Sequence, residues 1–227
     1  MVLAVALFAG RSAGEQVPSP DASVQLAGAI TGRADVIDGD TLAIDGVRIR
    51  LEGIDAPEAG QTCGQSQAGT LGCGAKAAGA LARLADGKPI RCEQRGLDKY
   101  GRTLGVCFAG ELELNAWMVR QGYAWAFAKY STSYVKEEAA ARSEKLGIWQ
   151  GEALPPWEYR AQRWAGVKER APDGCAIKGN VTARGKIYHM PWSPWYAKVK
   201  VDALNGERWF CSEADALAVG WRPAAAN

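Results

Sequence analysis

The chain has 227 residues, a formal net charge of +2 and 48% hydrophobic residues. This length accommodates one or two domains, and the apolar fraction excludes an intrinsically disordered protein. The near-neutral charge excludes a general polycation, so any contact with nucleic acid has to come from a local basic patch.

The N-terminal region begins with a short apolar run from Val2 to Ala9. The run is too short to span a bilayer as a helix, and the sequence shows no membrane span elsewhere. It resembles the apolar core of a secretory signal, although the basic segment that normally precedes such a core is missing. A frayed apolar terminus is the alternative. We expect an exported protein, periplasmic or extracellular, with residues 1–25 forming the signal-like segment and a flexible lead-in.

An acidic segment follows, VIDGDTLAIDGVRIRLEGIDAPE at residues 36–58, and is expected to form a β-hairpin. Its Asp45-Gly46 dipeptide lies between two apolar-alternating runs, and both positions of such a turn favour positive φ. The segment carries six acidic side chains and two arginines. Because like charges repel at close range, a compensating positive charge is implied. The arginines, a metal ion or both could supply it.

The next elements are predicted from turn residues, such as glycine and proline, and from the spacing of apolar residues. The glycines and cysteines of residues 59–74 predict a loop. Helices are expected over 75–86, 112–121 and 134–146. Strands are expected over 90–94 and 104–108, with the turn centred on Lys99 and Tyr100. Together the pattern predicts an α+β fold, a five-stranded OB-type β-barrel with about three helices, followed by a small β-rich module.

Six cysteines are present and none forms a CxxC zinc pair. An even number at wide spacing favours disulfides in an oxidising compartment, and six reduced thiols in a cytosolic protein are the alternative. The turn at Lys99 and Tyr100 puts two cysteines directly opposite each other, within disulfide reach. The expected pairs are Cys92–Cys107, Cys63–Cys73 and Cys175–Cys211.

Two aspartates, Asp40 and Asp55, lie on or just past neighbouring predicted strands and can converge on one hard cation. Calcium and magnesium prefer oxygen ligands such as carboxylates and main-chain carbonyls. The single histidine, His189, excludes multi-histidine zinc or iron sites. The acidic segment therefore predicts an oxygen-rich metal site.

Arg50 and Arg102 supply planar, permanently charged donors that match phosphate. Residues 88–102 hold five basic and two acidic side chains, a local charge of +3. Glu58 could accept a proton from water. A metal, a base and two guanidiniums form a set that can hydrolyse a phosphodiester.

Each of these features also has a purely structural interpretation. Asp-Gly-Asp is often only a turn, and an arginine on a strand often extends along the surface. Arg102 could simply pair with Asp98 in its own hairpin. The combination, more than any single residue, favours a catalytic site.

Five motifs in order, VIDGDTL, RIRLEGIDAPE, DKYGR, NAWMVRQGYA and EKLGIW, closely resemble the thermonuclease (staphylococcal-nuclease-like) family. The resemblance covers roughly residues 30–150. It implies an OB-fold nuclease that binds one Ca²⁺ ion, cuts DNA and RNA, and leaves 3′-phosphate ends. The expected division is therefore a nuclease-like OB-fold domain over 26–152, a linker over 153–172, and an aromatic-rich module over 173–227.

The resemblance also implies a role for each matching residue. Asp40, Asp55 and the carbonyl of Ala56 would hold the metal, with Asp38 behind them. Glu58 would activate water, and Arg50 and Arg102 would bind phosphate. The implied substrate contacts are Lys99, Tyr100 and Tyr130.

The C-terminal block, 173–227, has three possible metal ligands, and a disulfide is favoured over zinc. Its aromatic residues are expected to form a small core, with a base-stacking platform as the alternative. For the whole chain, the main alternative to a calcium-dependent nuclease is a non-catalytic OB-fold protein that binds nucleic acid. No oligomeric partner is predicted.

Overall fold

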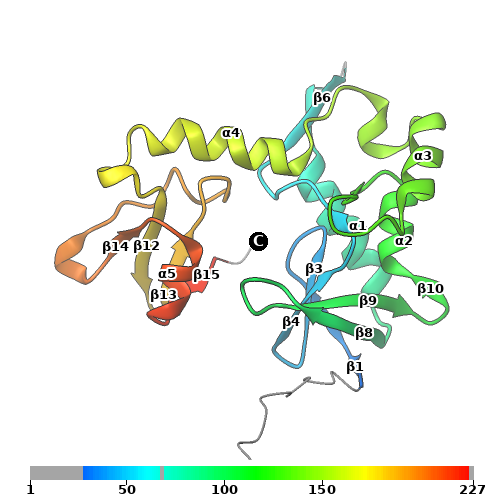
Figure 1. Ribbon diagram of the computed structural model, residues 1–227, viewed down its shortest axis with the longest axis horizontal. Helices are drawn as coiled ribbons and strands as arrows, with labels where there is room; N and C mark the ends of the chain where they lie inside the picture. The colour runs from blue at the N-terminus through cyan, green and yellow to red at the C-terminus, as the bar shows by residue number, and fades with distance from the viewer. Residues whose placement is uncertain (1–27, 67–68, 225–227) are drawn as a thin grey trace, which may run out of the picture.

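The computed structural model of the chain describes residues 28–66 and 69–224, so the predicted signal-like segment lies outside the described residues. Two β-rich parts are joined by a long helix, α4 (Pro156–Lys168), which runs from one part to the other (Figure 1). Within the described ranges, no helix is long and apolar enough to cross a membrane.

The N-terminal part is built on one mixed sheet with strand order β1-β8-β9-β4-β3-β2, with β10 added to β9. Its longer strands are β1 (Ala29–Gly32), β3 (Thr41–Ile44), β4 (Val47–Leu51), β8 (Ile90–Leu97) and β9 (Thr103–Ala109). The short ones are β2 (Ala34–Val36) and β10 (Leu112–Glu113). β4 and β9 pair in parallel, and the other pairs of this sheet are antiparallel.

The predicted turn between β3 and β4 is confirmed. Asp45 and Gly46 both have positive φ, 49° and 81°. These are the conformations that match a two-residue turn to the twist of the flanking strands. The turn fixes the register that pairs Thr41 with Arg50, so a polar side chain on each strand lies near the same end of the hairpin.

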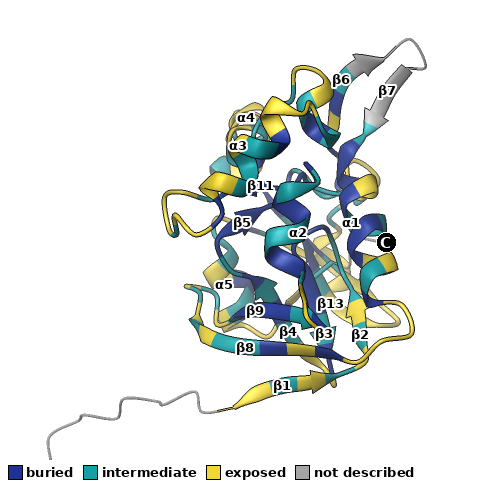
Figure 2. Cartoon of the chain, turned by 90° about the vertical axis from the view of Figure 1, so that its right-hand side faces the viewer, coloured by how far each residue is buried: buried dark blue, intermediate teal, exposed yellow. Residues whose placement is uncertain are grey.

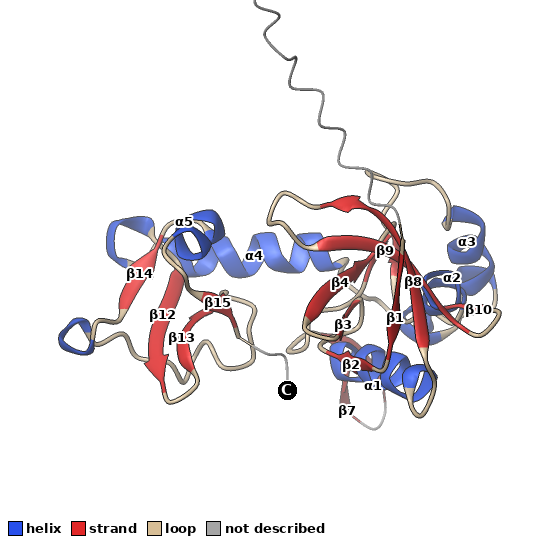
Figure 3. Ribbon diagram, turned by 90° about the horizontal axis from the view of Figure 1, so that it is seen from below, coloured by secondary structure: helices blue, strands red, loops and turns tan. Residues whose placement is uncertain are grey.

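The three predicted helices are present: α1 (Cys73–Ala85), α2 (Leu114–Arg120) and α3 (Val135–Ser143). Helices α1 and α2 pack against this sheet, and α3 packs against α2. Figure 3 shows α1 next to β2, and α2 and α3 beside β10. A 3₁₀ turn, η1 (Gly147–Gln150), follows α3. The buried faces of the strands, α1 and α2 meet in one apolar core that includes Leu42, Ile49, Leu81, Leu114 and Met118 (Figure 2). A second small sheet pairs β5 (Ile54–Asp55) with β11 (Trp125–Ala126).

The loop predicted over 59–74 is wrong in its central part, which forms a hairpin of β6 (Thr62–Ser66) and β7 (Gly69–Gly72). Gly64 has a φ of 61° and lies where the register shifts. A glycine at such a position produces a β-bulge, so it permits an irregular ribbon where the composition suggested a loop.

All three predicted disulfides are present: Cys63–Cys73, Cys92–Cys107 and Cys175–Cys211. Cys92 and Cys107 are directly opposed in the β8–β9 pair, as the position of the turn predicted. The first bond closes the β6–β7 hairpin onto α1, and the third lies in the C-terminal module.

The C-terminal module is a four-stranded sheet with order β14-β12-β13-β15. Its elements are η2 (Pro172–Gly174), β12 (Ile177–Thr182), β13 (Gly185–His189), η3 (Ala203–Asn205), β14 (Arg208–Phe210), α5 (Glu213–Ala218) and β15 (Arg222–Pro223). Tyr188, Phe210 and Trp221 are buried together with Ile177. These aromatic residues form a small core, as predicted, and the disulfide adds a covalent link that so small a module needs.

The segment predicted as a linker, 153–172, contains α4. Pro156 stands in the first turn of this helix, where a missing N–H costs nothing. Trp157 packs with the apolar cluster around Trp125 and Cys63, and Trp164 packs against the core of the C-terminal module. Since these two residues are seven positions apart, they lie on the same face of the helix, and α4 is fixed to both parts of the chain.

Candidate active site

The turn between β2 and β3 brings Asp40 to the edge of the sheet. The N–H groups of Ile37 and Asp38 both donate to the carbonyl of Thr41, at 2.9 and 3.2 Å. Asp38 Oδ1 accepts from the N–H of Asp40 at 3.1 Å. A Cβ atom on Gly39 would lie 2.7 Å from the Cβ atom of Ala56. Only glycine therefore allows this acidic turn to approach the segment that follows β5.

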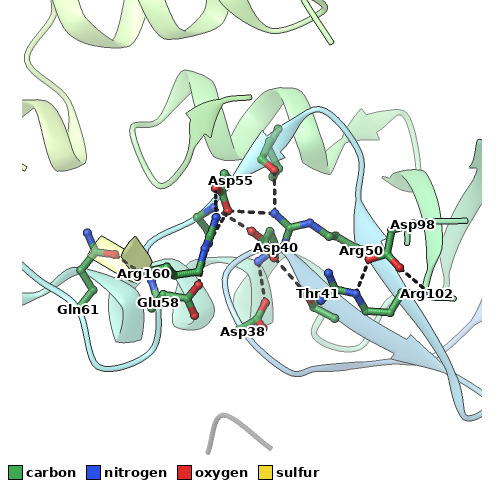
Figure 4. A network of polar contacts seen from close by, with 12 residues as sticks. Asp38, Asp40, Thr41, Arg50, Asp55, Glu58, Gln61, Asp98, Arg102 and Arg160 are labelled. Atoms are coloured by element: carbon green, nitrogen blue, oxygen red, sulfur yellow. Dashed lines mark hydrogen bonds and ion pairs between the residues drawn. The ribbon is translucent and has the colours of Figure 1, made fainter. Parts of the chain in front are cut away.

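Asp40 and Asp55 are joined by Arg50 (Figure 4). Arg50 Nη1 lies 2.5 Å from Asp40 Oδ1, and Nη2 lies 2.9 Å from Asp55 Oδ1. Asp40 Oδ2 accepts from the N–H of Ala56 at 2.9 Å. Both carboxylates are buried, with 4% of Asp40 and 0% of Asp55 exposed. The two predicted metal carboxylates therefore converge, with the predicted phosphate-binding arginine between them.

Glu58 is held beside this pair through its main chain. Its N–H donates to Gln61 Oε1 at 3.1 Å, and Gln61 Nε2 donates to the carbonyl of Leu154 at 2.6 Å. Gln61 is completely buried. Its amide therefore ties the Glu58 turn to the chain just before α4.

A residue that the sequence analysis did not identify, Arg160 of α4, completes the cluster (Figure 4). Its Nη2 lies 2.7 Å from Asp55 Oδ2, and its Nη1 lies 3.1 Å from Asp55 Oδ1 and 2.8 Å from Glu58 Oε1. Arg160 is three residues after Trp157 and four before Trp164, so it projects from the same helix face as these anchors. No local motif marks it, because its partners are more than 100 positions away.

The charges in the cluster do not balance. Asp38, Asp40, Asp55 and Glu58 face two guanidiniums, a formal excess of two negative charges when all four carboxyls are ionised. Burial, and then repulsion from Asp40, raises the pKa of Asp38 to about 6. Burial raises the pKa of Glu58 to about 7, although the Arg160 guanidinium acts in the opposite direction. Burial is the main cause of both shifts, and repulsion from neighbouring carboxylates acts in the same direction.

The arginines respond to the same field. Burial alone would lower the pKa of Arg50, but Asp40 and Asp55 raise it above its ordinary value. The pKa of Arg160 is likewise raised, because Asp55 and Glu58 outweigh the effect of burial. Both guanidiniums are therefore charged at any physiological pH.

The donors present fit a hard divalent cation. Carboxylate oxygens with excess negative charge are the ligands that calcium prefers. Within residues 28–66 and 69–224, no group of three or more His, Cys, Asp or Glu side chains is arranged to hold a metal ion. The predicted set contains only two such side chains, Asp40 and Asp55, and takes its third ligand from the main chain of Ala56.

Arg102 immediately precedes β9, the strand beside β4, and is held by its own hairpin. Its Nε lies 2.7 Å from Asp98 Oδ2, and its N–H donates to Asp98 Oδ1 at 2.9 Å. Arg50 pairs with Leu104 across the parallel strands, so Arg102, two residues earlier, projects toward the same face as Arg50. The two predicted phosphate-binding arginines thus share a face, while the described residues provide no ion pair between Arg102 and the acidic cluster.

The three predicted substrate contacts lie outside the cluster. Lys99 and Tyr100 are at the tip of the β8–β9 hairpin, with the Lys99 ammonium 4.8 Å from the centre of the Tyr100 ring. This hairpin tip points toward the C-terminal module in Figure 1. Tyr130 is 70% exposed and packs edge-on against Phe127. These residues could contact a substrate that extends beyond the acidic cluster.

Two family models match the chain in succession. The staphylococcal nuclease homologue family matches residues 48–151, and the ArfC family matches residues 159–223. The first match, with the mixed sheet, confirms the predicted α+β fold of OB type. Arg50, Asp55, Glu58 and Arg102 fall inside the first match. Arg160 falls inside the second, so the cluster combines side chains from two differently matched segments.

Several relatives match the N-terminal part of the chain. The chain is 38% identical over 126 residues to the succinoglycan biosynthesis protein ExoI of Rhizobium meliloti, across 54% of this chain and 66% of that protein. It is 34% identical over 143 residues to a micrococcal nuclease of Shigella flexneri, across 55% and 76%. It is 33% identical over 135 residues to an uncharacterized endonuclease of Haemophilus influenzae, across 56% and 70%.

Proposed function

Because the chain belongs to the staphylococcal nuclease family, we propose that it is a calcium-dependent nuclease of DNA and/or RNA that leaves 3′-phosphate ends. The observation that carries this proposal is the convergence of three carboxylates on two guanidiniums. Arg50 binds Asp40 and Asp55, and Arg160 binds Asp55 and Glu58. A fold that only needed to pack would not bury two carboxylates at one point and leave their charge partly uncompensated.

In this proposal Asp40 and Asp55 hold one calcium ion, with the carbonyl of Ala56 as the main-chain ligand. When bound, the ion would neutralise charge on a phosphate oxygen. Glu58 keeps 22% of its side chain exposed, which leaves it accessible to water. With a pKa raised to about 7, its carboxylate is a stronger base than an ordinary glutamate and can accept a proton from that water.

Arg50 and Arg102 bind the phosphate in this proposal. They project toward one face of two adjacent parallel strands, where both guanidiniums can meet the same phosphate group. Asp98 orients Arg102 through its Nε and leaves the terminal nitrogens for phosphate. Lys99, Tyr100 and Tyr130 contact the flanking nucleotides.

We further propose an exported protein in which a barrel domain and a small C-terminal module are joined by α4. Three disulfides support an oxidising compartment, because such bonds are rare where thiols are kept reduced.

The test is cleavage of single-stranded DNA and RNA by the purified protein, with calcium or with excess chelator. We expect cleavage only with calcium, and Asp40→Asn is expected to abolish it. Asp45→Asn is the matched control, because it removes the same charge from the same hairpin and asparagine also accepts positive φ. Treatment of the products with a phosphatase identifies 3′-phosphate ends.

Glu58→Gln adds a test of the base. It is expected to lower the single-turnover rate by at least about a hundredfold while substrate affinity changes little. Full activity in chelator would contradict the metal site. If the wild type binds DNA and never cuts it, the chain is instead a non-catalytic binding protein.

A further inference from the structure

Helix α4 carries a guanidinium into the acidic cluster from outside the segment that matches the nuclease family. Arg160 lies within the ArfC match, and the nuclease match ends at residue 151. The helix is anchored on both sides of Arg160. Trp157 stacks on Phe127 with ring centres 5.5 Å apart, and Trp164 packs against the core of the C-terminal module. The position of Arg160 is therefore built into the way the two parts of the chain join.

Arg160 occupies the oxygens that a cation on Asp55 would need. Its two terminal nitrogens bind both carboxylate oxygens of Asp55, and one of them also binds Glu58. Arg50, Thr41 and the Ala56 N–H occupy the oxygens of Asp40. Every carboxylate oxygen of the two aspartates thus already accepts at least one hydrogen bond.

A divalent ion on Asp55 and a guanidinium on the same carboxylate are close like charges. At a separation of about 4 Å their repulsion amounts to several kcal/mol, even at an effective dielectric constant of 20. Arg160 also directs its terminal nitrogens at carboxylates, so those N–H groups are not directed at a substrate phosphate. The observed contacts therefore favour competition with the cation over a third phosphate-binding arginine.

We propose that Arg160 is an internal counter-cation of the acidic cluster, which calcium has to displace from Asp55 and Glu58. The C-terminal module thereby sets the cation affinity of the nuclease site through α4. Trp157 and Trp164 keep α4 in place, so only the Arg160 side chain moves when calcium binds. This inference rests on the proposed calcium-dependent function.

Two consequences distinguish this role from that of a structural ion pair. Without calcium, loss of Arg160 leaves the negative charge of the buried Asp55 carboxylate less well compensated, and the protein should unfold more readily. With calcium, the variant should bind the ion more tightly. If Arg160 leaves Asp55 free for calcium in about 10% of wild-type molecules, removal of Arg160 tightens the apparent calcium affinity about tenfold.

The experiment is calorimetric titration of calcium into the full chain, with thermal unfolding recorded in chelator and in saturating calcium. The variants are Arg160→Ala and Arg160→Gln, the second of which keeps a hydrogen-bond donor without the charge. Arg163→Ala is the control. It removes the same charge one turn further along α4, where Arg163 Nε binds the carbonyl of Pro191 and no carboxylate of the cluster.

Both Arg160 variants are expected to bind calcium at least about tenfold more tightly than the wild type, with Arg163→Ala within about twofold. In chelator, their melting temperature should be below that of the wild type. Calcium should raise the melting temperature of the variants by more than it raises that of the wild type. Unchanged calcium affinity in both variants would overturn the inference, as would equal tightening in Arg163→Ala. A hundredfold loss of turnover at saturating calcium with unchanged affinity would assign Arg160 to the substrate instead. Absence of calcium binding in every protein would overturn the proposed function as well, whereas calcium-dependent cleavage with equal affinities overturns this inference alone.

Discussion

Gly74 of α1 packs directly against the main chain of Glu58. A Cβ atom on Gly74 would lie 1.8 Å from the Glu58 carbonyl oxygen and 2.5 Å from its carbonyl carbon. The obstacle is backbone, which cannot rotate out of the way as a side chain could. The first turn of α1 therefore determines how closely the Glu58 turn approaches the acidic cluster, and glycine is the only residue that fits.

Gly74→Ala should displace the Glu58 turn and reduce stability. Overpacking of this kind costs about 1–3 kcal/mol, and the shift should also lower the cleavage rate. Urea denaturation and single-turnover cleavage measure the two effects. Gly79→Ala on the same helix is the control, because its Cβ atom would meet only Arg83 Nη1 at 3.5 Å. It should be neutral or stabilising. Equal behaviour of the two variants would show that the close contact is unimportant.

Arg102→Ala should cut the turnover rate by at least about a hundredfold, because arginines that meet growing phosphate charge can supply large rate factors. Substrate affinity should weaken far less, since other basic residues still contact the backbone. Arg95→Ala is the matched control on the same hairpin, where Arg95 pairs with the exposed side chain of Glu93. Single-turnover cleavage and a binding titration separate the two quantities. Wild-type cleavage by Arg102→Ala would leave Arg102 with only its structural ion pair to Asp98.

The Cys92–Cys107 bond should contribute about 3 kcal/mol to the free energy of unfolding, as expected for a loop of about 15 residues. The double variant Cys92→Ala, Cys107→Ala should lose this amount in urea denaturation. Wild-type protein in reductant is the control, because it lacks the bond and keeps the sulfur atoms. Peptide mapping without reduction, on protein from its native compartment, tests export at the same time. Free thiols at Cys92 and Cys107 would contradict both the disulfide and export.

The C-terminal module should lose stability in mild acid through His189. Burial, and then Lys178, lowers the pKa of His189 below 6.5. Its Nε2 contacts Asn180 Oδ1, while Nδ1 is buried and finds no partner among residues 28–66 and 69–224. The unfolded chain binds a proton near pH 6.5 that the folded chain rejects. Stability therefore falls as pH drops below about 6.5, by at most about 1.4 kcal/mol per pH unit. His189→Gln should reduce this slope in urea denaturation at pH 7.5 and 5.5, and an identical slope would contradict the assignment.

Local sequence chemistry predicted much of this molecule. The Asp45-Gly46 turn, the opposition of Cys92 and Cys107, and the three helices of the barrel part all follow from signals within a few residues. The convergence of Asp40 and Asp55 was predictable from adjacent strands and from the family motifs. Their roles, and that of Ala56, remain proposals.

Arg160 could not be predicted in this way. Its partners are distant in the chain, and the Pro155-Pro156 pair at the start of α4 was interpreted as a domain boundary followed by a linker. The spacing of Trp157 and Trp164 was the available signal, because two tryptophans seven residues apart mark one apolar helix face. The β6–β7 hairpin was missed for a different reason, since glycine permits both a loop and a bulged strand.

The parallel pairing of β4 with β9 also has a kinetic consequence. The β3–β4 and β8–β9 hairpins join neighbouring segments, whereas Arg50 and Leu104 come together only when a long loop closes. Such closure costs chain entropy before any contact repays it, so it is expected late in folding. A partly folded chain with both hairpins would still lack the common face of Arg50 and Arg102. The Glu52 amide donates to the carbonyl of Gly105 and so reports on the pairing of these two strands. In pulse-labelled hydrogen exchange, the hairpin amides should therefore be protected before the Glu52 amide. Simultaneous protection would contradict this order.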